Sequence, residues 1–114
     1  VEGFYGSGGT ALQGAGASPG VAEGVARVVA DTGDLARVQS GDILVTTMTT
    51  PAWTPLFPSL AGLVTETGGI LSHAAVVARE YGLPAVVGAV GAVTAIPDGK
   101  RVRIDGTSGA ISLL

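Results

Sequence analysis

The sequence predicts an α/β fold with mixed sheets, and three observations lead to this prediction. Short apolar runs of strand length, rich in β-branched residues, occur at residues 43–47, 60–65 and 85–87. A helical segment over residues 72–81 separates the last two runs, and such alternation is typical of a parallel sheet with helix crossovers. Strand-rich segments at both ends of the chain predict a second, small β layer.

Composition limits the chain to one folded domain with few kinds of site. With 114 residues, 46% of them hydrophobic and 13% charged, it is long enough for one core and too apolar to be disordered. A net charge of −3 and six scattered basic residues argue against nucleic-acid binding. No cysteine and a single histidine exclude a disulfide framework and argue against a zinc site.

The longest uncharged stretch, residues 43–65, contains three prolines and six threonines, so we expect no membrane span. We expect a cytoplasmic protein. Residues 1–17 contain six glycines and little hydrophobic periodicity, which predicts a flexible linker from a preceding domain. Residues 18–114 are then the folded domain.

The first half of this domain is predicted to be mainly strand. Residues 21–30 are rich in valine and alanine and indicate one strand or a bent strand pair around Gly24. Residues 34–39 have room for one or two helical turns. A turn at residues 40–42 then precedes the buried strand over residues 43–47.

Two threonine–proline pairs follow this strand. Thr50-Pro51 and Thr54-Pro55 each offer a helix N-cap with proline at the first helical position. Trp53 and Phe57 lie in the same stretch, and burial in the core is the favoured interpretation for such large aromatic side chains. The alternative is a docking surface for partner domains.

The second half contains the clearest helix and a closing hairpin. The helix over residues 72–81 ends at Gly82, a suitable C′ residue, and Pro84 prevents its continuation. Asp-Gly pairs separate the apolar runs at residues 101–104 and 110–113, which predicts a β-hairpin.

His73, the only histidine, is the candidate site residue. It is predicted on the first turn of a helix that follows a buried strand, at the sheet edge where α/β proteins form their sites. The first turn has backbone N–H groups without helical partners, which stabilise an anion. An unprotonated imidazole nitrogen has the lone pair of a nucleophile.

Four neighbours support this site. Gly68 or Gly69 can take a positive φ at the strand-to-helix bend and leave room for a bulky phosphate donor, and Thr67 precedes them. Ser72 is the natural N-cap. The alternative is that His73 has only a structural role.

The helix has one predicted core face. Ala74, Val77, Ala78 and Tyr81 recur at helical spacing and form this face. His73 lies beside it.

Residues 65–88, TETGGILSHAAVVAREYGLPAVVG, resemble the phosphohistidine motif of the phosphoenolpyruvate-utilising enzymes. The segments SPGVAEGVARV at residues 18–28, GDILVT at 41–46 and DGTSG at 105–109 are similar to the same family's mobile domain. The run PAWTPLF at residues 51–57 resembles the rifampicin phosphotransferase-like branch. The resemblance covers residues 17–114 and implies a swivelling β/β/α three-layer domain that carries a phosphoryl group on His73.

Two positions qualify this resemblance. Many members have Thr or Ser two residues before the histidine, where this chain has Leu71. Arg79 matches the family's Ala-Arg pair, but six residues beyond His73 it is rotated by roughly 120° around the helix. A structural ion pair of Arg79 is therefore favoured over contact with the phosphoryl group.

These observations predict a carrier domain of a multidomain phosphotransferase. No lysine or arginine occurs between residues 43 and 78, whereas phosphoryl transfer depends on cationic groups and usually on Mg²⁺. We therefore expect no cofactor or metal on this domain. ATP and Mg²⁺ are expected on a nucleotide-binding domain, and the acceptor on an acceptor-binding domain. The alternative, motivated by Leu71, is a binding module with the same fold that is not phosphorylated.

Overall fold

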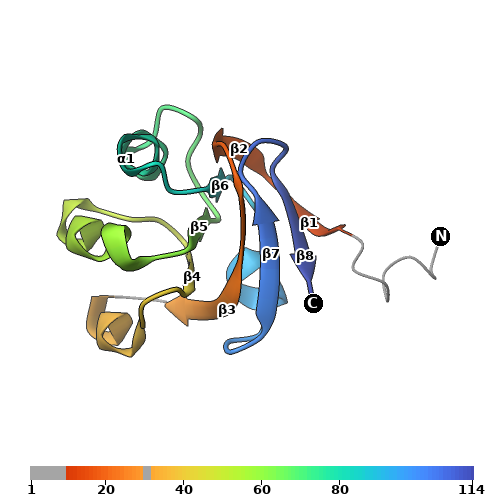
Figure 1. Cartoon of the computed structure of the whole chain (residues 1–114), viewed down its shortest axis with the longest axis horizontal. Coiled ribbons are helices and arrows are strands. Elements are labelled where there is room, and N and C mark those ends of the chain that lie inside the picture. Colours follow the sequence, from red (N-terminus) through yellow and green to blue (C-terminus); the bar gives the residue numbers. More distant parts are fainter. Residues whose placement is uncertain (1–9, 30–31) are drawn as a thin grey trace.

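The computed structural model describes residues 10–29 and 32–114 of the chain, and these form a mixed α/β fold (Figure 1). Its elements, in chain order, are β1 (Thr10–Gln13), β2 (Ala15–Ser18), β3 (Val21–Val29), the 3₁₀ helix η2 (Thr32–Arg37), β4 (Ile43–Thr46), the 3₁₀ helix η3 (Pro51–Ser59), β5 (Gly62–Thr65), α1 (His73–Tyr81), β6 (Ala85–Val87), α2 (Ala92–Ala95), β7 (Arg101–Asp105) and β8 (Ala110–Leu113).

The strands are ordered β1-β8-β7-β3-β4-β5-β6-β2. The four strands β3, β4, β5 and β6 run parallel, and the remaining pairs are antiparallel. β3 belongs to both parts, because Val21–Val25 pair with β7 and Ala26–Val29 pair with β4. Of the two alternatives for residues 21–30, the single strand is correct, and it changes partners just beyond Gly24.

The sheet nearly closes on itself. Its two edge strands, β1 and β2, are separated in the chain by Gly14 alone. The Gly14 N–H donates to the carbonyl of Gly109, and a Cβ at position 14 would lie 2.6 Å from the Val87 carbonyl oxygen. The connection therefore packs directly against neighbouring backbone, where no side chain fits.

The predicted linker is shorter than expected from its glycines. Residues 1–9 lie outside the described part of the chain, but residues 10–13 and 15–18 are strands paired with β8 and β6. The physical reason is non-local, since each strand is stabilised by a partner about 70 to 100 residues away, and glycine content alone does not reveal such pairing.

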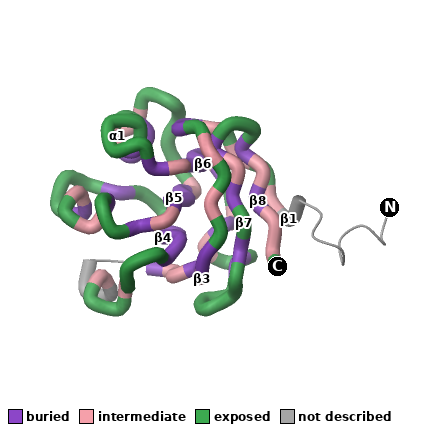
Figure 2. Tube along the Cα trace, viewed as in Figure 1, coloured by how far each residue is buried: buried purple, intermediate pink, exposed green. Residues whose placement is uncertain are grey.

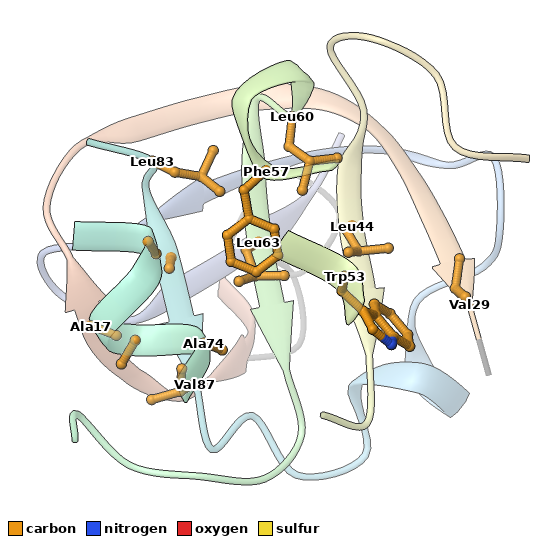
Figure 3. Close-up of a cluster of buried hydrophobic side chains, with 13 residues drawn as sticks. Ala17, Val29, Leu44, Trp53, Phe57, Leu60, Leu63, Ala74, Leu83 and Val87 are labelled. Atoms are coloured by element: carbon orange, nitrogen blue, oxygen red, sulfur yellow. The ribbon is translucent and has the colours of Figure 1, made fainter. Parts of the chain in front are cut away.

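Two hydrophobic clusters lie on opposite faces of the parallel strands, whose buried stretches are purple in Figure 2. One packs between these strands and the segments η3 and α1, and Figure 3 shows Phe57 over Leu63, with Trp53 beside Leu44. The other joins the parallel strands to β7, β8 and α2 through side chains such as Ile43. The predicted burial of Trp53 and Phe57 is confirmed.

The predicted strands 43–47, 60–65 and 85–87, the closing hairpin and the helix are confirmed, with small shifts at their ends. Ser72 is the N-cap of α1, and Gly82 ends it with a φ of 66°. The predicted core face needs one correction, because Tyr81 is exposed and Ala75 is buried in its place.

The threonine–proline pairs start one 3₁₀ helix, not two helices. η3 runs through Pro55 and Pro58 without a break, and Thr50 caps it without a side-chain hydrogen bond. The short helix α2 was not predicted. None of the helices in the described residues is both long enough and apolar enough to cross a bilayer.

Candidate active site

The candidate site lies where β4 and β5 end. The two strands are parallel and in register, so the loops that follow them leave the sheet at the same edge. The loops are tied together: the N–H of Glu66 donates to the carbonyl of Thr46, and the N–H of Thr67 to that of Thr47. The loop after β5 then turns into α1, which begins at His73.

The bend before α1 depends on Gly68 and not on Gly69. Gly68 has a φ of 94°, and a Cβ there would lie 2.9 Å from the Cβ of Ser72. Gly69 has no positive φ and has open space where a Cβ would be. The sequence left open which glycine makes the bend, and the structure assigns it to Gly68.

Ser72 and His73 are both half-buried at the start of the helix. The Ser72 hydroxyl accepts a long hydrogen bond of 3.5 Å from the N–H of Ala75. The imidazole therefore belongs to the first turn of α1. Backbone N–H groups of this turn lack partners within the helix, and the positive end of the helix dipole lies here. This environment favours a group that becomes anionic.

Both ring nitrogens of His73 face threonine hydroxyls, one from the loop after β4 and one from η3. The Oγ1 atom of Thr49 lies 3.0 Å from Nδ1, and the Oγ1 atom of Thr54 lies 3.5 Å from Nε2. The ring of Phe57 lies 6.4 Å from the imidazole, centroid to centroid, at an angle of 56°. The imidazole thus lies between the loop that follows β4 and the helix η3.

A cavity of about 90 Å³ opens beside the histidine. Its lining comes from the β4–η3 loop, the end of β5 and the start of α1, and consists of Met48, Thr49, Thr65, Thr67, Gly68, Ser72, His73 and Ala74. Three of the predicted site residues besides His73, namely Thr67, Gly68 and Ser72, are therefore brought together. Gly69 and Arg79 are not part of this lining.

Other polar groups at this edge have structural partners. The hydroxyl of Thr65 donates to the carbonyl of Thr67, and that of Thr67 donates to the carbonyl of Thr47. The carboxylate of Glu66 accepts from the N–H of Val93 at 2.9 Å. Within residues 10–29 and 32–114 no group of three or more His, Cys, Asp or Glu side chains that could hold a metal ion is found.

Arg79 has a structural role, but through carbonyl groups. It donates to the carbonyl of Ala17 in β2 at 2.8 Å and to that of Ile70 at 2.6 Å. Among the described residues no carboxylate pairs with Arg79, and its two hydrogen bonds there go to carbonyl groups instead of the predicted ion-pair partner. The guanidinium instead fastens the loop that precedes His73 to the sheet.

Thr49 and Thr54 are the contacts of His73 that sequence reasoning missed. A signal was present, because a threonine-rich run directly follows the buried strand at 43–47. Parallel neighbouring strands end at one edge, so hydroxyls after one strand face a histidine after the next. The pairing of individual atoms depends on the register of β4 and β5.

Residues 38–109 match the family model described as "PEP-utilising enzyme, mobile domain". This chain belongs to that family. The match includes β4, β5, α1 and the whole environment of His73 described above.

Two larger proteins contain a segment that is similar in sequence to this chain. Over 104 residues, or 91% of the chain, it is 56% identical to a rifampicin phosphotransferase from Streptomyces sviceus. Over 100 residues, or 88% of the chain, it is 47% identical to a probable phosphoenolpyruvate synthase from Archaeoglobus fulgidus. The chain spans only about 12–13% of the length of these proteins.

A solved structure shows the same fold. The solution structure of an Enzyme I protein superposes with a TM-score of 0.61 at 28% identity, covering 70% of this mobile domain and 33% of that chain. In all three relatives the mobile domain is therefore a minor part of a larger polypeptide.

Proposed function

We propose that this domain is the swivelling β/β/α three-layer phosphohistidine carrier of a multidomain phosphotransferase. His73 would accept a phosphoryl group at one site and deliver it at another. The observation that carries the proposal is the placement of the imidazole on the first turn of α1, with Nδ1 held at 3.0 Å by Thr49. The relatives named above support the class of reaction.

We infer from the contact with Thr49 that Nε2 is the reactive nitrogen. With its proton on Nδ1, the imidazole donates to the Thr49 hydroxyl, and Nε2 keeps the lone pair. Nε2 attacks the phosphorus of the donor. The N–P bond forms as the donor's P–O bond breaks, and the departing oxygen takes the bonding electron pair. Nδ1 keeps its proton, so the ring needs no separate base.

The phosphoryl group then lies next to the helix start. Backbone N–H groups of the first turn and the positive end of the helix dipole favour its negative charge. The hydroxyl of Thr54, 3.5 Å from Nε2, is the nearest side-chain donor on the reacting side. The bond to Nε2 is reversible, since the next acceptor attacks the same phosphorus and the lone pair returns to the ring.

Other domains complete the reaction. Between residues 43 and 78 the chain has no lysine or arginine, while transfer of a phosphoryl group needs cationic groups to neutralise it. We propose that a nucleotide-binding domain holds ATP and Mg²⁺, or a corresponding domain holds phosphoenolpyruvate, and that an acceptor-binding domain holds the final acceptor. We also propose that the enzyme is cytoplasmic, where ATP and phosphoenolpyruvate are available.

The test is phosphoryl labelling of the full-length polypeptide. We expect radiolabelled ATP or phosphoenolpyruvate to give an acid-labile label on the wild type, and His73→Gln to give none while still binding ATP at the nucleotide domain. Glutamine keeps a polar side chain of similar length but has no nucleophilic ring nitrogen. Full turnover by His73→Gln, or an unlabelled wild type, contradicts the proposal.

Intact-mass measurement separates the carrier from a binding module of the same fold. A carrier gains the mass of one phosphoryl group after incubation with the donor, and a binding module gains none. Leu71 motivated the second possibility, but its side chain is exposed, and the nitrogen–hydroxyl contacts of His73 come from Thr49 and Thr54.

A further inference from the structure

Exposed apolar side chains surround the candidate site. Four of them, Met48, Ile70, Leu71 and Val76, form what we call the apolar rim. Met48 lines the cavity beside His73, Ile70 and Leu71 occupy the loop that leads into α1, and Val76 lies one helical turn after the histidine. Figure 2 shows this loop as exposed, and the exposed fraction of Leu71 is 85%.

The exposure of Leu71 is stabilised by the fold and is not a frayed end. Gly68 sets the bend before it, and Arg79 binds the carbonyl of Ile70 at 2.6 Å. The loop is thus fastened with two large apolar side chains directed at solvent. Apolar groups gathered around a reactive side chain on a protein surface mark an interaction site.

This surface has almost no charged groups that could attract a partner domain. The only charged residue between positions 43 and 78 is Glu66, and its carboxylate is bound to the N–H of Val93. An unphosphorylated carrier therefore presents an almost uncharged face. A domain that binds this face must gain its binding energy from apolar burial.

From these observations, and resting on the proposed function, we propose that the apolar rim docks onto the phosphoryl-donor domain of the same polypeptide. That domain would have an apolar surface surrounding a donor site that is lined by cations. The relatives are about eight times longer than this chain, so such a domain has room in the polypeptide. The ends of the described chain lie at the far end of the molecule from α1, which leaves the rim accessible (Figure 1).

The charge of the carrier distinguishes the donor domain from the acceptor domain. When the carrier approaches the donor, it does not yet hold the anionic phosphoryl group, so burial of the rim supplies the attraction between the two surfaces. When it approaches the acceptor, the phosphoryl group is anionic and is attracted by the cations of that site. The rim should therefore matter more for loading the carrier than for unloading it. Contact between the apolar rim and the donor domain also excludes water from the reacting phosphoryl group.

The test compares Leu71→Gln and Met48→Gln with Val21→Gln in the full-length protein. Val21 is a matched control, because it is 61% exposed but lies on β3 where that strand pairs with β7. Two rates are measured: label uptake by His73 from radiolabelled ATP or phosphoenolpyruvate, and loss of label from preloaded protein to the acceptor. All three positions are exposed, and equal thermal melting temperatures would verify intact folding.

We expect Leu71→Gln to slow label uptake by about tenfold, because glutamine gains much less than leucine from burial. A variant with both Leu71→Gln and Met48→Gln should slow it further. Unloading and the Val21→Gln protein should match the wild type. Unchanged uptake in Leu71→Gln overturns the inference, and so does slowed unloading with normal uptake, which assigns the rim to the acceptor domain. A wild type that takes up no label contradicts the proposed function itself.

Discussion

The antiparallel strands and the site edge of the parallel strands use polar groups in opposite ways. Around β3 and β7 the charges are paired: Arg27 with Asp42 at 3.0 Å, Arg37 with Asp98 at 3.0 Å, and Arg103 with Glu23 at 2.6 Å. At the site edge both ring nitrogens of His73 face neutral hydroxyls. Three of the domain's arginines thus hold its framework, and the hydroxyls that face His73 are neutral.

This difference suits a carrier, which must release what it binds. A hydrogen bond between an ionised donor and an anion contributes about 1.5–3 kcal/mol, roughly twice that of a neutral one. An arginine beside His73 would hold the phosphoryl group more tightly and slow its delivery. Neutral hydroxyls at Thr49 and Thr54 position the ring without adding this cost.

The largest expected effect comes from matched truncations in the two hydrophobic clusters. Phe57 and Ile104 are both buried, the first near His73 and the second on β7. We expect Phe57→Ala to lower the free energy of unfolding by about 3–5 kcal/mol and Ile104→Ala by about 2–5 kcal/mol, measured by urea denaturation.

Phosphorylation should separate these two variants. Because the Phe57 ring packs near the imidazole, its loss should slow label uptake even in the folded fraction of the protein. Folded Ile104→Ala protein should be labelled as fast as the wild type. Equal uptake by the two variants, corrected for the folded fraction, would mean that the clusters are not functionally distinct.

A smaller effect is expected at the two glycines before α1. Gly68→Ala forces a side chain into a φ of 94° and against Ser72, so it should lower the free energy of unfolding by about 1–2 kcal/mol and slow label uptake. Gly69→Ala meets no atom and should be neutral or stabilising by up to about 1 kcal/mol. Equal losses in both would argue against the bend assigned to Gly68.

The smallest effect concerns the stability of the folded domain at acid pH, through Asp98 and its partners. The N–H of Val28, with a further contribution from Arg37, lowers the pKa of Asp98 below its ordinary value of 3.8. The unfolded chain therefore binds the proton first. The stabilisation by this carboxylate is complete above the ordinary pKa and is lost as the pH falls through the lowered value in the folded state.

Asp98→Asn should therefore reduce the loss of unfolding free energy between about pH 5 and about pH 2. The change should not exceed about 1 kcal/mol, because the side chain is 42% exposed. Arg37→Gln is the matched control and should keep most of the acid dependence, since the Val28 N–H is the larger cause. Denaturant titrations across this pH range would decide, and a steeper loss in Asp98→Asn contradicts the assignment.

Local signals in the sequence were sufficient for the elements that present His73. Ser72 and Gly82 cap α1 through their own conformations, so its limits could be predicted within one residue. The strands before and after it are short apolar runs that a parallel sheet buries on both faces. The position of the histidine at the sheet edge followed from these two facts.

The remaining features depend on contacts between distant parts of the chain. The Thr49–His73 hydrogen bond spans 24 residues and requires the register of β4 against β5. Arg79 was assigned a carboxylate partner because sequence spacing does not reveal the carbonyl of Ala17, 62 residues away. β1 and β2 form from glycine-rich sequence because β8 and β6 provide their hydrogen bonds.

The pairing of β1 with β8 has a consequence for how this domain is inherited. Thr10 lies opposite Ser112, so the two ends of the described chain leave the molecule side by side, away from His73. A unit with adjacent ends can be inserted into a longer gene product, or exchanged between them, without disturbing its own core. Similar modules accordingly occur in relatives as different as a probable phosphoenolpyruvate synthase and a rifampicin phosphotransferase.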